Sequence, residues 1–128
     1  MKIISRKMHG ALDYGSAILL IAAPWLFGFS DVEPAKSISI GAGILILLMS
    51  LMTNYETGMV KVIPMQIHLY ADIMLGIFLV ISPWVFGFNA ETSVFHVIMG
   101  LFAIASGVMT NSESLHHRSP DQQHSMAR

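Results

Sequence analysis

The 128-residue chain is 54% hydrophobic and only 12% charged, with a mean hydropathy of +0.63. An ordinary soluble domain carries about 25% charged residues, so this composition excludes a water-soluble globular protein and predicts an integral membrane protein. The absence of cysteine excludes disulfides, iron–sulfur clusters and nucleophilic thiols. The net charge of -1 argues nothing about nucleic acid, but the seven Lys and Arg residues never form a run. This excludes a basic stripe that follows a phosphate backbone, and no nucleic-acid partner is expected.

Four long apolar segments follow one another, at residues 11–29, 34–52, 67–88 and 94–109. A helix rises 1.5 Å per residue, so about 20 residues cross a hydrocarbon core about 30 Å thick. The segments lack the alternation of barrel strands, and four strands cannot close a barrel in a membrane. The sequence therefore predicts an all-α membrane protein with four transmembrane helices and the lipid bilayer as its surroundings.

The two halves of the chain are an internal duplication. Residues 9–29 align without gaps on residues 68–88, with identities at His9/His68, Asp13/Asp72, Ile18/Ile77, Leu20/Leu79, Pro24/Pro83, Trp25/Trp84, Phe27/Phe86, Gly28/Gly87 and Phe29/Phe88. After a two-residue deletion, Gly43 aligns with Gly100. Each repeat is thus expected to be a helical hairpin. Because each copy crosses the membrane twice, both copies have the same orientation and form a four-helix bundle with a pseudo-two-fold axis along the membrane normal.

The duplication divides the chain into five parts. They are an N-terminal segment (1–8), the first two-helix repeat (9–56), a connection (57–66), the second two-helix repeat (67–113) and a polar tail expected to be disordered (114–128). Six of the seven basic residues fall on one side of the four-helix path, namely Lys2, Arg6, Lys7, Lys61, Arg118 and Arg128. Only Lys36 falls on the other side. The positive-inside rule therefore predicts that both termini and the central connection are cytoplasmic.

A Pro-Trp core recurs in both repeats, as Ala23-Pro24-Trp25 and Ser82-Pro83-Trp84. This pattern resembles the SPW repeat family of small prokaryotic integral membrane proteins, over most of the chain. The resemblance implies that the motif lies in the first helix of each repeat and that the protein lies in the prokaryotic cell membrane, but it implies no established activity. Since Ala23 replaces the serine in the first copy, we expect any role of that hydroxyl to belong to the second repeat only.

The aromatic motif has two interpretations. It falls at the predicted outer ends of the first and third helices, where it would suit the mouth of a ligand site. The favoured interpretation is structural: Trp25 and Trp84 anchor the interface, the prolines distort the last turns, and Gly28 and Gly87 allow a tight hairpin.

The most suggestive polar residues are the repeated pairs His9/Asp13 and His68/Asp72, spaced four apart so that each pair shares one helix face. Three interpretations are open. The aspartates suit helix N-termini and the histidines contact headgroups; or the pairs meet across the pseudo-two-fold axis and form a proton or divalent-cation site; or the two histidines ligate a haem.

The second helix of each repeat ends in a Thr-Asn-x-Glu motif, with Thr53, Asn54 and Glu56 in the first copy and Thr110, Asn111 and Glu113 in the second. We interpret these residues as helix-end caps, although they could also complete a polar cluster with the His/Asp pairs. The small-residue pairs Ser37/Gly41 and Ala103/Gly107 suit close helix contact. His96, without a histidine in the other repeat, is predicted to be interfacial.

No sequence motif of a catalytic site is present, so an enzyme is not expected and no cofactor is implied. The leading hypothesis is a structural or interaction membrane protein, either as a homo-oligomer or with a membrane-protein partner. The alternative is a proton or cation binding or permeation unit built on His9, Asp13, His68 and Asp72. The direction in which Asp13 and Asp72 face distinguishes them: inward and close together favours the alternative.

Overall fold

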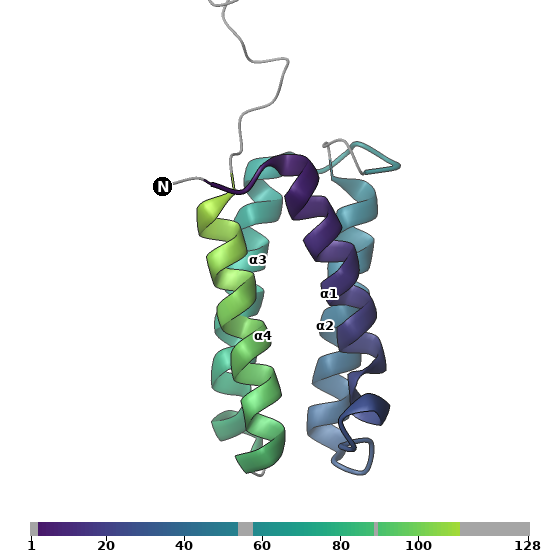
Figure 1. The fold of residues 1–128 in the computed structure, drawn as a ribbon, viewed down its shortest axis with the longest axis vertical. Helices are drawn as coiled ribbons and strands as arrows, with labels where there is room; N and C mark the ends of the chain where they lie inside the picture. Colours follow the sequence, from purple (N-terminus) through teal and green to yellow (C-terminus); the bar gives the residue numbers. More distant parts are fainter. Residues whose placement is uncertain (1–2, 54–57, 89, 111–128) are drawn as a thin grey trace, which may run out of the picture.

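The computed structural model describes residues 3–53, 58–88 and 90–110 and is all-α. Its helices are α1 (Arg6–Leu26), α2 (Glu33–Met52), α3 (Met65–Phe86) and α4 (Ala90–Met109). They form two antiparallel hairpins, α1/α2 and α3/α4, which stand side by side (Figure 1). We call the end with the two hairpin turns the hairpin end. The opposite end, where α1 and α3 begin and α2 and α4 finish, is the terminal end.

Three of the four helices are long and apolar enough to cross a membrane. They are α2, α3 and α4. Large apolar side chains such as Ile18, Met74 and Leu101 are exposed on the outside, as expected where lipid is the solvent. These observations define a multi-pass membrane protein. Helix α1 has 21 residues, but His9 and Asp13 make it more polar, and its crossing stays a prediction.

The two helices of each hairpin approach closely at repeat-equivalent glycines. A Cβ added to Gly43 would lie 2.7 Å from the carbonyl oxygen of Ala17, and one added to Gly100 would lie 2.5 Å from that of Gly76. These contacts are too short for a side chain, so glycine is required. The expected contact at Ser37/Gly41 is wrong, because Ser37 is exposed and nothing lies within 4 Å of a Cβ at Gly41.

Helices α1 and α3 end in the same way. Gly28 and Gly87 have φ of 73° and 71°, which is the left-handed conformation that glycine adopts without strain. The N–H groups of Phe29 and Phe88 donate to the carbonyls of Pro24 and Pro83, each at 2.8 Å. This is the Schellman arrangement, and it ends α1 and α3 before the last residues of the apolar segments.

Each proline leaves one helix carbonyl without its usual partner, because proline has no N–H to donate four residues back. The carbonyl left by Pro83 is that of Leu79, and the Ser82 hydroxyl donates to it at 2.8 Å. The carbonyl left by Pro24 is that of Leu20. Here the donor is Ser39 of α2, at 2.6 Å.

A serine hydroxyl therefore binds the carbonyl freed by proline in both repeats. This differs from the expectation, based on Ala23, that the role of the hydroxyl belongs to the second repeat only. The first repeat supplies this hydroxyl from its second helix, and the second repeat supplies it from the residue before proline.

The tryptophans of the motif lie on the outside of the hairpin end, where Trp25 and Trp84 are 61% and 72% exposed. Lys36 lies over the Trp25 ring, with Nζ 6.0 Å from its centroid.

We predict that Ser39→Ala lowers the free energy of unfolding by about 1 to 3 kcal/mol, because it leaves the buried Leu20 carbonyl without a donor. Adding Ala23→Ser should restore most of that loss, since Ser82 shows that a serine before proline reaches the freed carbonyl. Unfolding by denaturant in detergent micelles measures both effects. A double variant no more stable than Ser39→Ala alone would contradict this assignment.

Candidate cation-binding site

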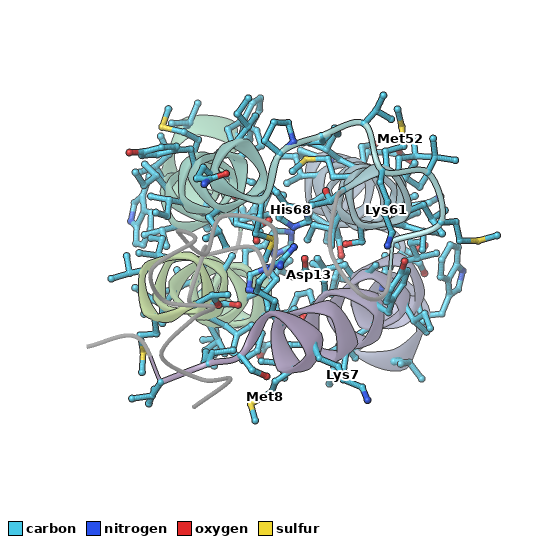
Figure 2. The ribbon with its side chains drawn as sticks, turned by 90° about the horizontal axis from the view of Figure 1, so that it is seen from above. Lys7, Met8, Asp13, Met52, Lys61 and His68 are labelled. Carbon is cyan, nitrogen blue, oxygen red and sulfur yellow. The ribbon has the colours of Figure 1, made fainter. Side chains whose placement is uncertain are left out.

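Four ionisable side chains meet inside the bundle near the terminal end. They are His9 and Asp13 of α1 and His68 and Asp72 of α3, and all are buried: the histidines are 0% exposed, Asp13 is 6% exposed and Asp72 is 4% exposed. Figure 2, seen along the bundle from the terminal end, shows His68 and Asp13 near the centre of the four helices. Lys7 and Met8, on the same end of α1, point outward in that view.

The shortest contacts cross between the two repeats. His9 Nε2 lies 2.8 Å from Asp72 Oδ2, and His68 Nε2 lies 2.6 Å from Asp13 Oδ2. Within each repeat the corresponding N···O distances are longer, 3.0 Å for His9/Asp13 and 3.3 Å for His68/Asp72. We call these four residues the crossed cluster. It joins one hairpin to the other, because each histidine is bound most closely by the carboxylate of the opposite repeat.

A threonine holds the other nitrogen of each imidazole. Thr53 Oγ1 lies 2.6 Å from His68 Nδ1, and Thr110 Oγ1 lies 2.8 Å from His9 Nδ1. Each threonine donates its only hydroxyl proton to a backbone carbonyl one turn back, of Met49 or Ser106. The threonine oxygen therefore accepts from an Nδ1–H, and this leaves Nε2 directed at the carboxylates.

The cluster is duplicated in its ligands but not in its surroundings. Ser50 of α2 donates to Asp13 Oδ2 at 3.2 Å, whereas Gly107 occupies the equivalent place in α4. In the second repeat a different serine, Ser106, lies 3.0 Å from His9 Nδ1. The two carboxylates are thus chemically distinct: Asp13 receives a hydroxyl donor in addition to the two histidines.

Each crossed pair needs one proton between Nε2 and Oδ2, because two lone pairs at 2.6 to 2.8 Å would repel. Since Nδ1–H already donates to threonine, that proton makes the pair either imidazolium with carboxylate or neutral imidazole with carboxylic acid. Both forms are neutral overall. The arrangement is therefore compatible with an apolar interior, where an unpaired charge would cost several kcal/mol.

The same four residues form a donor set for a metal ion. One ligand atom from each lies within 4.8 Å of all the others. Two imidazoles and two carboxylates suit a tetrahedral divalent transition metal, whose bonds of about 2.0 to 2.2 Å place ligand atoms about 3.3 Å apart. The cross-repeat contacts of 2.8 and 2.6 Å are shorter than this, so metal binding would widen them by about 0.5 to 0.7 Å. The threonine-held Nδ1–H groups are the outer hydrogen bonds that orient metal-binding histidines.

A small cavity adjoins both carboxylates on the side of the hairpin end. Its volume is about 10 Å³ for the centre of a water molecule, which is room for about one water. Asp13, Asp72 and Ser106 form its polar wall, and the apolar side chains of Leu20, Leu79 and Met99 close it.

The geometry of the four side chains distinguishes the three interpretations of the pairs. The side chains face inward, so they do not contact headgroups. A haem between His9 and His68 would have to displace both carboxylates, because the ring centroids are only 5.3 Å apart and each Nε2 already faces an aspartate. The arrangement corresponds to the second interpretation, in which the pairs meet across the pseudo-two-fold axis.

Thr53 is the C-cap residue of α2, as expected, and Thr53 and Thr110 also belong to the polar cluster through His68 and His9. The backbone N–H groups of Ile63 and Ile4 donate to the carbonyls of Met52 and Met109, which finish α2 and α4. Ile4 and Ile63 occupy equivalent positions in the two repeats, so the C-terminal ends of α2 and α4 accept equivalent backbone hydrogen bonds. The remaining residues of the predicted caps lie outside the described residues: Asn54, Glu56, Asn111 and Glu113.

His96 is the polar residue that the sequence interpretation misplaced. It is fully buried at the hairpin end, with Nε2 3.1 Å from the carbonyl oxygen of Ala35. The rings of Phe29 and Phe88, one from each hairpin turn, lie 5.5 and 4.7 Å from its ring. His96 therefore packs between the two hairpin turns. Ser39, at the equivalent position of the first repeat, instead forms a hydrogen bond within its own hairpin.

The fold and the crossed cluster define a duplicated helical membrane protein with one polar centre shared by two hairpins. The SPW repeat domain matches residues 7–110, and the chain belongs to the SPW repeat family. The resemblance of its Pro-Trp motifs to that family is thereby confirmed. Comparisons with curated proteins and with solved structures found no match.

We predict that Thr53→Val lowers the free energy of unfolding by about 1 to 3 kcal/mol, because it removes the acceptor of the buried His68 Nδ1–H. Thr53→Ser keeps the hydroxyl and should retain most of the stability. Thermal or denaturant unfolding in detergent compares them. Equal stability of the valine and serine variants would show that the threonine does not hold the imidazole.

Proposed function

We propose that the protein is a membrane-embedded cation-binding protein whose crossed cluster binds one divalent transition-metal ion in place of its two shared protons. The observation that carries this proposal is the convergence of His9, Asp13, His68 and Asp72, with all four ligand atoms within 4.8 Å inside an apolar bundle. Buried ionisable groups are costly in a membrane and are retained chiefly where they bind or relay cations.

The direction of the aspartates favours this function over a purely structural one. Asp13 and Asp72 face each other within the bundle and share the same two histidines. A device that only complements helix N-termini has no need of convergence between repeats. Duplication of the pairs supports a site that needs two identical contributions, one from each hairpin. The proposal includes no catalytic step.

The proposal includes a topology. All four helices cross a prokaryotic cell membrane, both termini are cytoplasmic, and the hairpin end faces outward. The charge distribution supports this orientation: Lys7 and Lys61 lie at the terminal end, and the acidic Asp31, Glu33 and Glu91 lie at the hairpin end. The crossed cluster then lies just inside the cytoplasmic boundary of the bilayer.

We predict that the purified protein binds one zinc ion per chain and that zinc raises its stability. At a free zinc concentration of 100 times Kd, the gain should be about 2.7 kcal/mol. Equilibrium dialysis and thermal unfolding measure both quantities. The tail residues His116, His117 and His124 are changed to Asn throughout, so that they add no ligand. Acidic pH should weaken binding, because protons compete for the same atoms.

Asp13→Asn/Asp72→Asn should abolish zinc binding, and His9→Gln/His68→Gln should do the same by removing the other two ligands. The matched control is Glu33→Gln/Glu91→Gln, which removes two carboxylates far from the cluster and should bind zinc normally. Zinc binding that survives in the Asn variant, or that is absent from the unchanged cluster, would overturn the proposed function.

The topology is tested separately. Because the chain lacks cysteine, a single cysteine at Glu33 or Glu91 should react with an impermeant thiol reagent in intact cells. Single cysteines at Lys61 or Ser119 should react only after the cells are opened. Labelling of Lys61→Cys in intact cells would reverse the proposed orientation.

A further inference from the structure

The two hairpins meet unequally along their length. At the terminal end α1 and α4 are joined, since the Ile4 N–H donates to the Met109 carbonyl at 3.0 Å and His9 contacts Thr110. Helices α2 and α3 also pack against each other, and at the hairpin end the rings of Phe27 and Phe29 contact Phe95 of α4 in the second of the two hairpins that stand side by side (Figure 1). We call the boundary between the first hairpin and α4 at the hairpin end the seam.

A pocket of about 530 Å³ lies in this seam, and we call it the outer pocket. Its volume falls in the range of about 300 to 1,000 Å³ that is typical of small-molecule sites. The first hairpin contributes Phe27 and Phe29, and α4 contributes Phe95, Ile98 and Met99. The Phe95 ring lies 5.1 Å from the Phe27 ring and 5.7 Å from the Phe29 ring, so the wall is an aromatic cluster.

Among the described residues, the charged group that lines the outer pocket is the carboxylate of Glu91 in the first turn of α4. Glu91 is exposed at this end of the pocket. Asp31 and Glu33 add negative charge on the same end of the bundle, where Lys36 lies close to Glu33 at 3.8 Å. A pocket with aromatic walls and a carboxylate at its edge attracts a cation with an apolar body, because ring faces and the carboxylate both favour positive charge.

We propose that the outer pocket binds a lipophilic cation, such as an aryl- or alkyl-substituted ammonium or phosphonium, with its apolar groups against the phenylalanines and its charge near Glu91. This site is distinct from the crossed cluster. None of the four residues of the crossed cluster lines the outer pocket, and Met99 lines both this pocket and the small cavity beside the carboxylates. Occupancy of one site therefore does not require the other.

The probe is tetraphenylphosphonium, and tetraphenylborate is an anion of nearly the same size and shape. Equilibrium dialysis against the purified protein in a nonionic detergent measures binding. We expect saturable binding of one phosphonium per chain, with little binding of the borate. Glu91→Gln should weaken phosphonium binding about fivefold, as expected for loss of one partly solvated charge interaction.

The duplication provides matched controls. Phe27→Leu should weaken binding, whereas Phe86→Leu, the repeat-equivalent change outside the outer pocket, should not. Glu33→Gln removes a carboxylate from the same end of the bundle but not from the pocket, and it should retain the affinity of the unchanged protein. All four positions are exposed, so the variants should keep their unfolding temperature without the probe.

Equal affinities for the phosphonium and the borate, or equal affinities of the unchanged protein and Glu91→Gln, would overturn the proposal and identify the pocket as a slot for lipid acyl chains. The Asp13→Asn/Asp72→Asn variant tests the outer pocket independently of the proposed function. It should lose zinc and still bind the phosphonium, so failure at one site is distinguishable from failure at the other.

Discussion

Two imidazoles and two carboxylates can lie inside an apolar bundle only if their charges cancel and their hydrogen bonds are complete. The crossed cluster meets both conditions, because each histidine is bound by the aspartate of the other repeat and by a threonine at the end of a neighbouring helix. Removing a histidine or an aspartate leaves its partner buried and unpaired, at a cost of about 3 to 5 kcal/mol for a broken ion pair. Removing a threonine hydroxyl costs less, about 1 to 3 kcal/mol. The two hairpins are therefore held together by polar contacts at one end.

This constraint explains features elsewhere in the fold. The glycine contacts at Gly43 and Gly100 bring the helices of each hairpin together, which places Thr53 beside α3 and Thr110 beside α1 at the terminal end. Away from the cluster the two repeats use different residues at equivalent positions. Ser39 and Ser82 satisfy equivalent proline-freed carbonyls from different helices, and His96 packs between the hairpin turns without a histidine in the first repeat.

The repeat and its hydropathy were sufficient to predict an all-α fold of two helical hairpins, because membrane helices and sequence duplication leave direct patterns. The sequence also selected His9, Asp13, His68 and Asp72 as a group that could meet. It did not indicate that the closest contacts cross between repeats, since the four-residue spacing also favours pairing within one helix. Which of the two pairings is closer depends on how the two hairpins pack against each other, and a local sequence pattern does not indicate this packing. Ser37/Gly41 and His96 were misplaced for the same reason: composition identified small and polar residues but not the helix face that each occupies.

The central claim is that the four side chains of the crossed cluster bind a single metal ion together. X-ray absorption spectroscopy of the zinc-loaded protein, with the three tail histidines replaced, tests it most directly because it counts the ligands and measures their distances. The account predicts four-coordinate zinc with two imidazole nitrogens and two carboxylate oxygens at about 2.0 to 2.2 Å. A six-coordinate shell of oxygens, or a shell without imidazole, would contradict it.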